Sequence, residues 1–227
     1  KSYAIGSQAL IKFMQAYGAS AETVLGEMLL YVFMEQELNA PKIMSKIEIN
    51  DLGRSIESKS DGVHLLAIND NGQLFHQLVF GASDVHGDLA IAIDRAFDKI
   101  IEIESNSDTE LKMVENTTHG SIYDSDTTNY MVNLLIPNKA SVAKPDMAFG
   151  VFLGYTLSLG YTETNNNKYR IAVKEHMKKD ISALKPYIEQ KIFDNGMSGY
   201  NFYFYVVPFN DAPLEKSSII SEMLDGR

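Results

Sequence analysis

The sequence predicts an α/β domain with a mixed sheet at its centre. Apolar segments follow one another in the order helix, strand, strand, strand, helix, and a mixed second half follows them. Two of the strands are joined by Asn71-Gly72, a pair that readily adopts the positive φ angles of a tight hairpin. The 227 residues, 45% of them hydrophobic, suffice for one large domain or two small ones.

The first helix is predicted over residues 21–38, where apolar side chains recur at three- and four-residue steps. Ser20 is a suitable N-cap, because its hydroxyl can accept from a free N–H of the first turn. Pro41 ends the helix, since proline disfavours helical geometry at the residue before it.

Three strands follow this helix. Residues 42–50 alternate between apolar and polar side chains, which is typical of a strand with one buried face. Residues 63–68 are apolar on both faces, as expected of a central strand. Residues 73–80 form the returning strand of the hairpin.

The remaining elements alternate between helices and strands. Residues 88–103 predict a helix, whereas the acidic residues 104–128 have weak periodicity and predict a loop. A short helix over 130–136 and a strand over 149–159 come next. A long helix over 168–193 then shows an apolar stripe at Ile171, Ile181, Leu184 and Ile188. An aromatic strand over 200–209 and a helix over 213–224 complete the chain.

Composition excludes several classes of protein. The chain has no cysteine, which excludes disulfides and thiolate chemistry and fits a cytoplasmic location. Its apolar runs are shorter than the roughly 20 residues that a membrane helix needs. The net charge of −10 opposes tight unaided binding to a phosphate backbone.

Candidate catalytic residues lie where the two hairpin strands would meet at one edge of the sheet. Metal-dependent phosphodiester hydrolysis needs carboxylates that hold a hard cation, often beside a lysine. Asp61 precedes the buried strand, where packing does not require an acid, although it could be a simple turn aspartate before Gly62.

After the returning strand, positions 82 and 84 share one face. A nuclease would place Glu-x-Lys there, but this chain has Ala82-Ser83-Asp84. Alanine cannot bind a metal.

Two further residues could complete such a site. Glu27 shares the inward face of the first helix with apolar neighbours, next to Gly26, which allows another backbone to approach closely. The alternative is a glutamate at the edge of the apolar stripe. Lys46 could supply the missing positive charge, or it could be an ordinary exposed lysine of a strand.

Other catalytic arrangements find little support. The five histidines show no metal-ligand spacing, although His86 could touch a phosphate or could cap the following helix. Residues 81–85 lack the last glycine of the serine-hydrolase elbow Gly-x-Ser-x-Gly. No nucleophile–base pair suggests a hydrolase of small molecules, so we expect no small-molecule substrate.

A basic segment contrasts with the acidic chain. Residues 168–191 hold seven bases against three acids, and Lys174, Lys178 and Lys185 lie at four- and seven-residue steps on one helix face. That face could meet DNA or an acidic partner, or it could simply be solvated.

Six short segments, in order along the chain, resemble the HamA family, the DUF1837-type subunit of the Hachiman anti-phage defence system. They are Leu25-Gly26-Glu27, the stretch from Ala40 to Lys46, Ser60-Asp61-Gly62-Val63-His64, Phe80-Gly81-x-Ser83, residues 148–155 and residues 202–209. The resemblance covers nearly the whole chain, from about Ala21 to Asn210.

The resemblance implies a restriction-endonuclease-like, or PD-(D/E)xK, core with a mixed central sheet flanked by helices and an α+β C-terminal elaboration. We expect the core in residues 1–104. Residues 105–227 would complete the sheet within the same compact domain and form a docking surface for a partner. The implied function is that of a Mg²⁺-dependent DNA nuclease which reaches DNA through a HamB-like helicase.

Carried over to this chain, the family pattern makes Glu27 the helix acid and Asp61 the first metal ligand. Ala82 stands in place of a glutamate, Asp84 in place of a lysine, and the Ser83 carbonyl would be a further ligand. The departures predict an inactive variant with weak or no Mg²⁺ binding. The alternative is a catalytically silent subunit that regulates or scaffolds the helicase.

Overall fold

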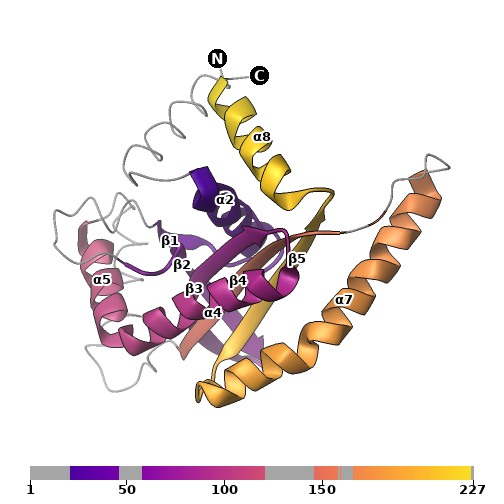
Figure 1. The fold of residues 1–227 in the computed structure, drawn as a ribbon. Helices are drawn as coiled ribbons and strands as arrows, with labels where there is room; N and C mark the ends of the chain where they lie inside the picture. The colour runs from indigo at the N-terminus through magenta and orange to yellow at the C-terminus, as the bar shows by residue number, and fades with distance from the viewer. Residues whose placement is uncertain (1–20, 46–57, 121–145, 158, 160–165, 226–227) are drawn as a thin grey trace.

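A computed structural model describes residues 21–45, 58–120, 146–157, 159 and 166–225. Its centre is a five-stranded sheet in the order β1-β2-β3-β4-β5 (Figure 1). The strands are β1 (Lys42–Ser45), β2 (Gly62–Asp70), β3 (Gln73–His86), β4 (Asp146–Thr156) and β5 (Asn201–Phe209). The first three are antiparallel, whereas β3, β4 and β5 are parallel. The predicted α/β fold with a mixed sheet is therefore confirmed, and strands from both halves of the chain share the sheet.

The hairpin between β2 and β3 forms as the sequence predicts. Asn71 and Gly72 have φ angles of 52° and 86°, and the Gly72 N–H donates to Asn69 Oδ1 over 3.0 Å. The predicted end of this strand, at residue 80, was wrong, however. Strand β3 continues to His86, because β4 pairs with it along residues 77–86. Residues 82–84 therefore lie within a paired strand and not beyond its end.

Helices cover both faces of the sheet. Helix α4 (Leu89–Ser105) begins after its N-cap Asp88, whose carboxylate accepts from the N–H groups of Ala90 and Ile91. It packs on one face with the inner side of α7 (Asn166–Asp194), whereas α2 (Ala21–Gln36) packs on the other. Helix α8 (Ala212–Asp225) lies against α2 through Ile220. The candidate site lies between the layers of α2 and α4.

One predicted loop is a helix. Helix α5 (Ser107–Gly120) falls within residues 104–128, where weak periodicity predicted irregular structure. Met113 and Val114 are buried in the core, and the buried carboxylate of Glu110 accepts from Ser58 Oγ and the Lys59 N–H. These contacts with distant parts of the chain stabilise a helix that the local sequence specifies poorly.

The long helix α7 was predicted correctly, but half of its proposed inner stripe was wrong. Ile171 and Ile181 are 58% and 38% exposed. The side chains that pack against the core are Val173, Met177, Leu184, Ile188 and Ile192. Contacts with other elements set this rotation of the helix: Tyr155 donates to Asp180 over 3.1 Å, and Lys191 pairs with Asp94 over 2.7 Å.

Two predicted elements lie outside the described residues, namely the second half of the strand over 42–50 and the short helix over 130–136. Within the described ranges, no helix combines the length and the apolar character that crossing a membrane requires.

Gly26 allows α2 to approach β3 closely, as its position beside Glu27 suggested. A Cβ atom built on Gly26 would lie 2.9 Å from Ser83 Oγ and 3.1 Å from Ser83 Cβ. Ser83 could not move aside freely, because its hydroxyl donates to Asp61 Oδ2 over 2.7 Å. The glycine therefore helps to set the position of the Ser83–Asp61 pair.

We predict that Gly26→Ala destabilises the protein. Overpacking costs about 1–3 kcal/mol, which exceeds the gain of about 1 kcal/mol from better helix propensity. The measurement is urea unfolding of the variant beside Gly199→Ala, a control at a glycine with open space around it. A Gly26→Ala protein as stable as the wild type would show that α2 and β3 have room to spare.

Candidate functional site

A network of hydrogen bonds fixes the backbone around Asp61. Ser60 Oγ donates to the carbonyl oxygen of Gly62 over 2.7 Å and accepts from the Gly81 N–H over 3.0 Å. The Asp61 N–H donates to the Gly81 carbonyl over 2.9 Å. Because Ser60 is fully buried, these bonds are shielded from water. They hold Asp61 beside β3 at the start of β2.

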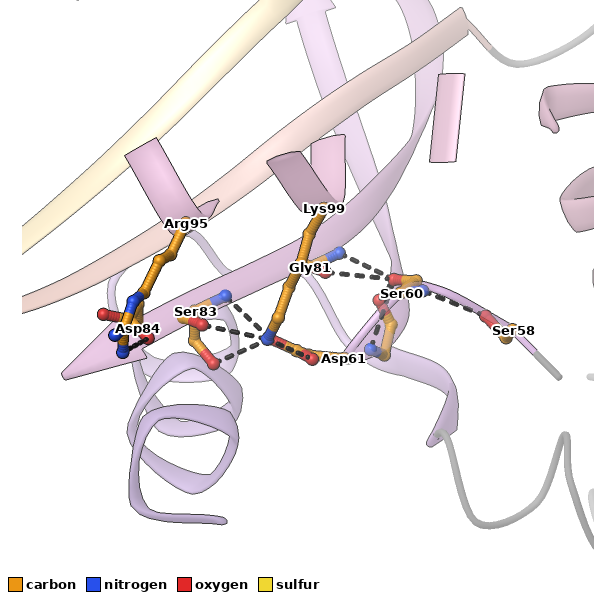
Figure 2. Close-up of polar contacts among 9 residues, drawn as sticks. Ser58, Ser60, Asp61, Gly81, Ser83, Asp84, Arg95 and Lys99 are labelled. Atoms are coloured by element: carbon orange, nitrogen blue, oxygen red, sulfur yellow. Dashed lines mark hydrogen bonds and ion pairs between the residues drawn. The ribbon is translucent and has the colours of Figure 1, made fainter. Parts of the chain in front are cut away.

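The Asp61 side chain is fully buried. Its carboxylate contacts Ser83 of β3 and Lys99 of α4 (Figure 2). Its Oδ2 atom accepts from the Ser83 N–H and from Ser83 Oγ, each over 2.7 Å. Lys99 Nζ lies 3.0 Å from Oδ1 and 2.9 Å from Oδ2 of the same carboxylate. Lys99 Nζ also donates to the Ser83 carbonyl over 2.9 Å. A turn aspartate would not need such partners, so we regard Asp61 as the centre of the site.

Lys99 is the site residue that the sequence did not reveal. It lies on α4, three residues after the buried Ala96 and four after Arg95, and therefore at the edge of the buried face. Burial lowers the pKa of its ammonium, but the attraction and hydrogen bonds of Asp61, together with the negative charges of Glu27 and Asp84, outweigh burial and raise that pKa. Lys99 is therefore a partly buried cation at neutral pH. The only sequence signal for Lys99 was its position beside the apolar stripe of this helix.

Glu27 faces the same region from α2. It is only 5% exposed, and its negative charge acts on Lys99. Glu27 and Asp61 both line a mainly apolar cavity of about 550 Å³. The proposed inward orientation of Glu27 is thus confirmed, and the structure places it near the Asp61–Lys99 pair.

Positions 82 and 84 share the face of β3 that packs toward α4. Ala82 is fully buried in the apolar core on that side. Asp84 Oδ1 lies 4.0 Å from the Arg95 guanidinium, and Figure 2 shows the two side chains facing each other. The Asp84 Oδ2 atom is buried and accepts no hydrogen bond from the described residues. Burial raises the Asp84 pKa, and nearby bases, Arg95 foremost, offset this only in part.

The other candidate residues do not join this cluster. Lys46 lies outside the described residues. His86 accepts from the Asp88 N–H through Nδ1 over 3.0 Å, which is the role beside the helix cap that was one of its two interpretations. Lys174, Lys178 and Lys185 are exposed along α7, and Lys185 pairs with Glu189 over 3.6 Å.

These residues fit a catalytic Mg²⁺ ion poorly. Of the three ligand positions expected from the family pattern, Asp61 and the Ser83 carbonyl both bind the Lys99 ammonium, and Ala82 offers no oxygen from its side chain. Across the described part of the chain, no cluster of three histidine or acidic side chains could hold a metal ion. Mg²⁺ usually takes at least one or two carboxylates and keeps several waters. Here the Asp61 carboxylate is already paired with the Lys99 ammonium.

We predict that Asp84→Asn becomes increasingly stabilising, relative to the wild type, as the pH rises from about 4 to 7. An acid whose pKa is raised on folding loses stability as the pH increases past its unfolded pKa of 3.8, and asparagine removes that loss. The measurement is thermal unfolding across this pH range. Asp98→Asn, at an exposed position of α4, is the control for charge. A pH-independent difference would contradict the assignment.

Comparison with known proteins gives one match. The family model described as HamA matches residues 1–223, which is nearly the whole chain. No curated protein matches the sequence, and no solved structure does. Three of the six segments that suggested the resemblance supply Glu27, Asp61 and Ser83, which lie in one region of the structure. The chain therefore belongs to the HamA family, and this membership indicates a subunit of the Hachiman anti-phage defence system.

Proposed function

We propose that this chain is a Hachiman subunit built on a nuclease-type core that does not itself cleave DNA. The observation that carries the proposal is the Asp61–Lys99–Ser83 arrangement, in which an ammonium binds the oxygens that a catalytic cation would need. Family membership is consistent with a defence nuclease. This chain retains Asp61 and Glu27 but has alanine and aspartate where the family pattern has glutamate and lysine.

The metal chemistry of an active relative would depend on groups that this site lacks. A bound Mg²⁺ would polarise the scissile phosphate and activate a water molecule. Ala82 removes the second carboxylate, and Asp84 adds a negative charge where a lysine would stabilise the developing negative charge. The residues present can orient one another and keep a buried cation. They cannot assemble the set of ligands from which this chemistry starts.

A subunit that does not cleave DNA would act through partners. We propose that a HamB-like helicase delivers the chain to DNA, because a net charge of −10 opposes binding by the chain alone. The exposed lysines of α7 are the proposed contact with DNA or with an acidic surface of the helicase. In this arrangement the chain regulates or scaffolds the helicase.

The direct test is a cleavage assay with the purified helicase complex on linear, nicked and circular DNA, with Mg²⁺ or with EDTA. We predict no Mg²⁺-dependent cleavage by the wild type. The double variant Ala82→Glu/Asp84→Lys restores the family pattern. We expect DNA cleavage by this double variant or by the triple variant that also carries Lys99→Met. Circular dichroism confirms folding. Cleavage by the wild type would contradict the proposal that this chain does not cleave DNA. A nuclease-type core would be contradicted if the double variant and the triple variant with Lys99→Met both fold and both stay inactive.

We also predict that Lys174→Ala/Lys178→Ala weakens DNA binding by the complex. Each lysine that contacts a phosphate contributes about 0.9 to the slope of log K against log salt, so the slope should fall by about 2. The matched control, Lys59→Ala/Lys112→Ala, removes two exposed lysines elsewhere. Equal slopes for the two double variants would show that Lys174 and Lys178 make no phosphate contact.

A further inference from the structure

The Lys99 ammonium has the surroundings of a bound cation. A lysine has three N–H donors and no acceptor. In this site three oxygens accept from it, namely Oδ1 and Oδ2 of Asp61 and the carbonyl oxygen of Ser83, at distances between 2.9 and 3.0 Å. The Lys99 side chain is 26% exposed and the Asp61 side chain is fully buried. The ammonium is therefore fully coordinated inside the protein.

Those oxygens belong to the classes that hard divalent cations prefer. Mg²⁺, Mn²⁺ and Ca²⁺ bind to carboxylate and carbonyl oxygens. An ammonium and a metal ion cannot both occupy the space between the Asp61 carboxylate and the Ser83 carbonyl. We propose that Lys99 is a built-in cation that replaces a divalent metal at this position and competes with any metal for the same ligands.

A second role for Lys99 is conceivable on the same contacts. It could be an accessory lysine that replaces the one missing at position 84 and works beside a bound metal. The geometry favours replacement, because Lys99 directs its donors at the would-be ligands themselves and no substitute carboxylate is supplied at position 82. A divalent ion added beside Lys99 would place three positive charges near Asp61, with Glu27 and Asp84 as the other acids that act on Lys99.

The proposal deepens the proposed function, because it gives a physical reason for the loss of metal chemistry. It is tested without DNA, helicase or cleavage. The two hypotheses can therefore fail separately. DNA cleavage by the wild-type complex would refute the proposed lack of nuclease activity, whereas the response of the isolated chain to metal ions decides the role of Lys99.

The experiment measures thermal unfolding of the isolated chain in MgCl₂ or MnCl₂. Lys99→Met removes the cation and leaves the Asp61 charge buried, so we expect Tm to fall by about 10 °C. We expect Mn²⁺, at about 100 times its Kd, to raise the Tm of this variant by about 5 °C. The wild type should show no such rise. Lys59→Met, which removes an exposed partner of Glu102, is the control for loss of a lysine.

The double variant Asp61→Asn/Lys99→Met identifies the ligand, because it should lose the response to Mn²⁺. Should Lys99→Met not fold unaided, refolding with and without Mn²⁺ gives the same comparison, and recovery only with Mn²⁺ supports the proposal. Two results would overturn it. One is a wild type stabilised by Mn²⁺ through Asp61. The other is a Lys99→Met protein that shows no response to either metal, whether as a folded protein or in refolding.

Discussion

The buried ion pair between Lys99 and Asp61 is the interaction on which the site depends. It joins three elements, because Asp61 precedes β2, the Ser83 groups belong to β3, and Lys99 comes from α4. Removing one partner of such a pair leaves an uncompensated buried charge, which typically costs about 3–5 kcal/mol. The surrounding structure supports the pair: Ser60 fixes the backbone of Asp61 from one side, and Gly26 allows α2 to approach Ser83 from the other.

If Lys99 replaces a metal ion as we propose, the same pair explains how a nuclease-type core could persist without one. Several acids close together repel one another, and a family relative would neutralise them with a divalent ion. In this chain the positive charge would come from the Lys99 side chain, which reaches Asp61 from α4. Asp84 lies at the margin of this site. Its carboxylate faces Arg95.

The sequence revealed the parts of the fold and site that depend on local patterns. The hairpin followed from Asn71-Gly72, and Asp61 stood out because it precedes a strand that is apolar on both faces. Lys99 could not be found in this way, since its contact with Asp61 spans 38 residues and depends on how α4 lies across the sheet. Helix α5 was missed for the same reason, because Glu110 is held by Ser58 and Lys59 and not by its own helical neighbours. On α7, docking against the core selected Met177 in place of Ile181.

We propose that an ammonium, and not a metal ion, neutralises Asp61. Anomalous X-ray diffraction from wild-type crystals soaked in MnCl₂ is the decisive measurement, because manganese is located by its own scattering. We expect no manganese between the Asp61 carboxylate and the Ser83 carbonyl, with Lys99 Nζ within hydrogen-bond distance of both. A manganese peak at that position, with Lys99 displaced or beside it, would show that a metal ion neutralises Asp61 instead.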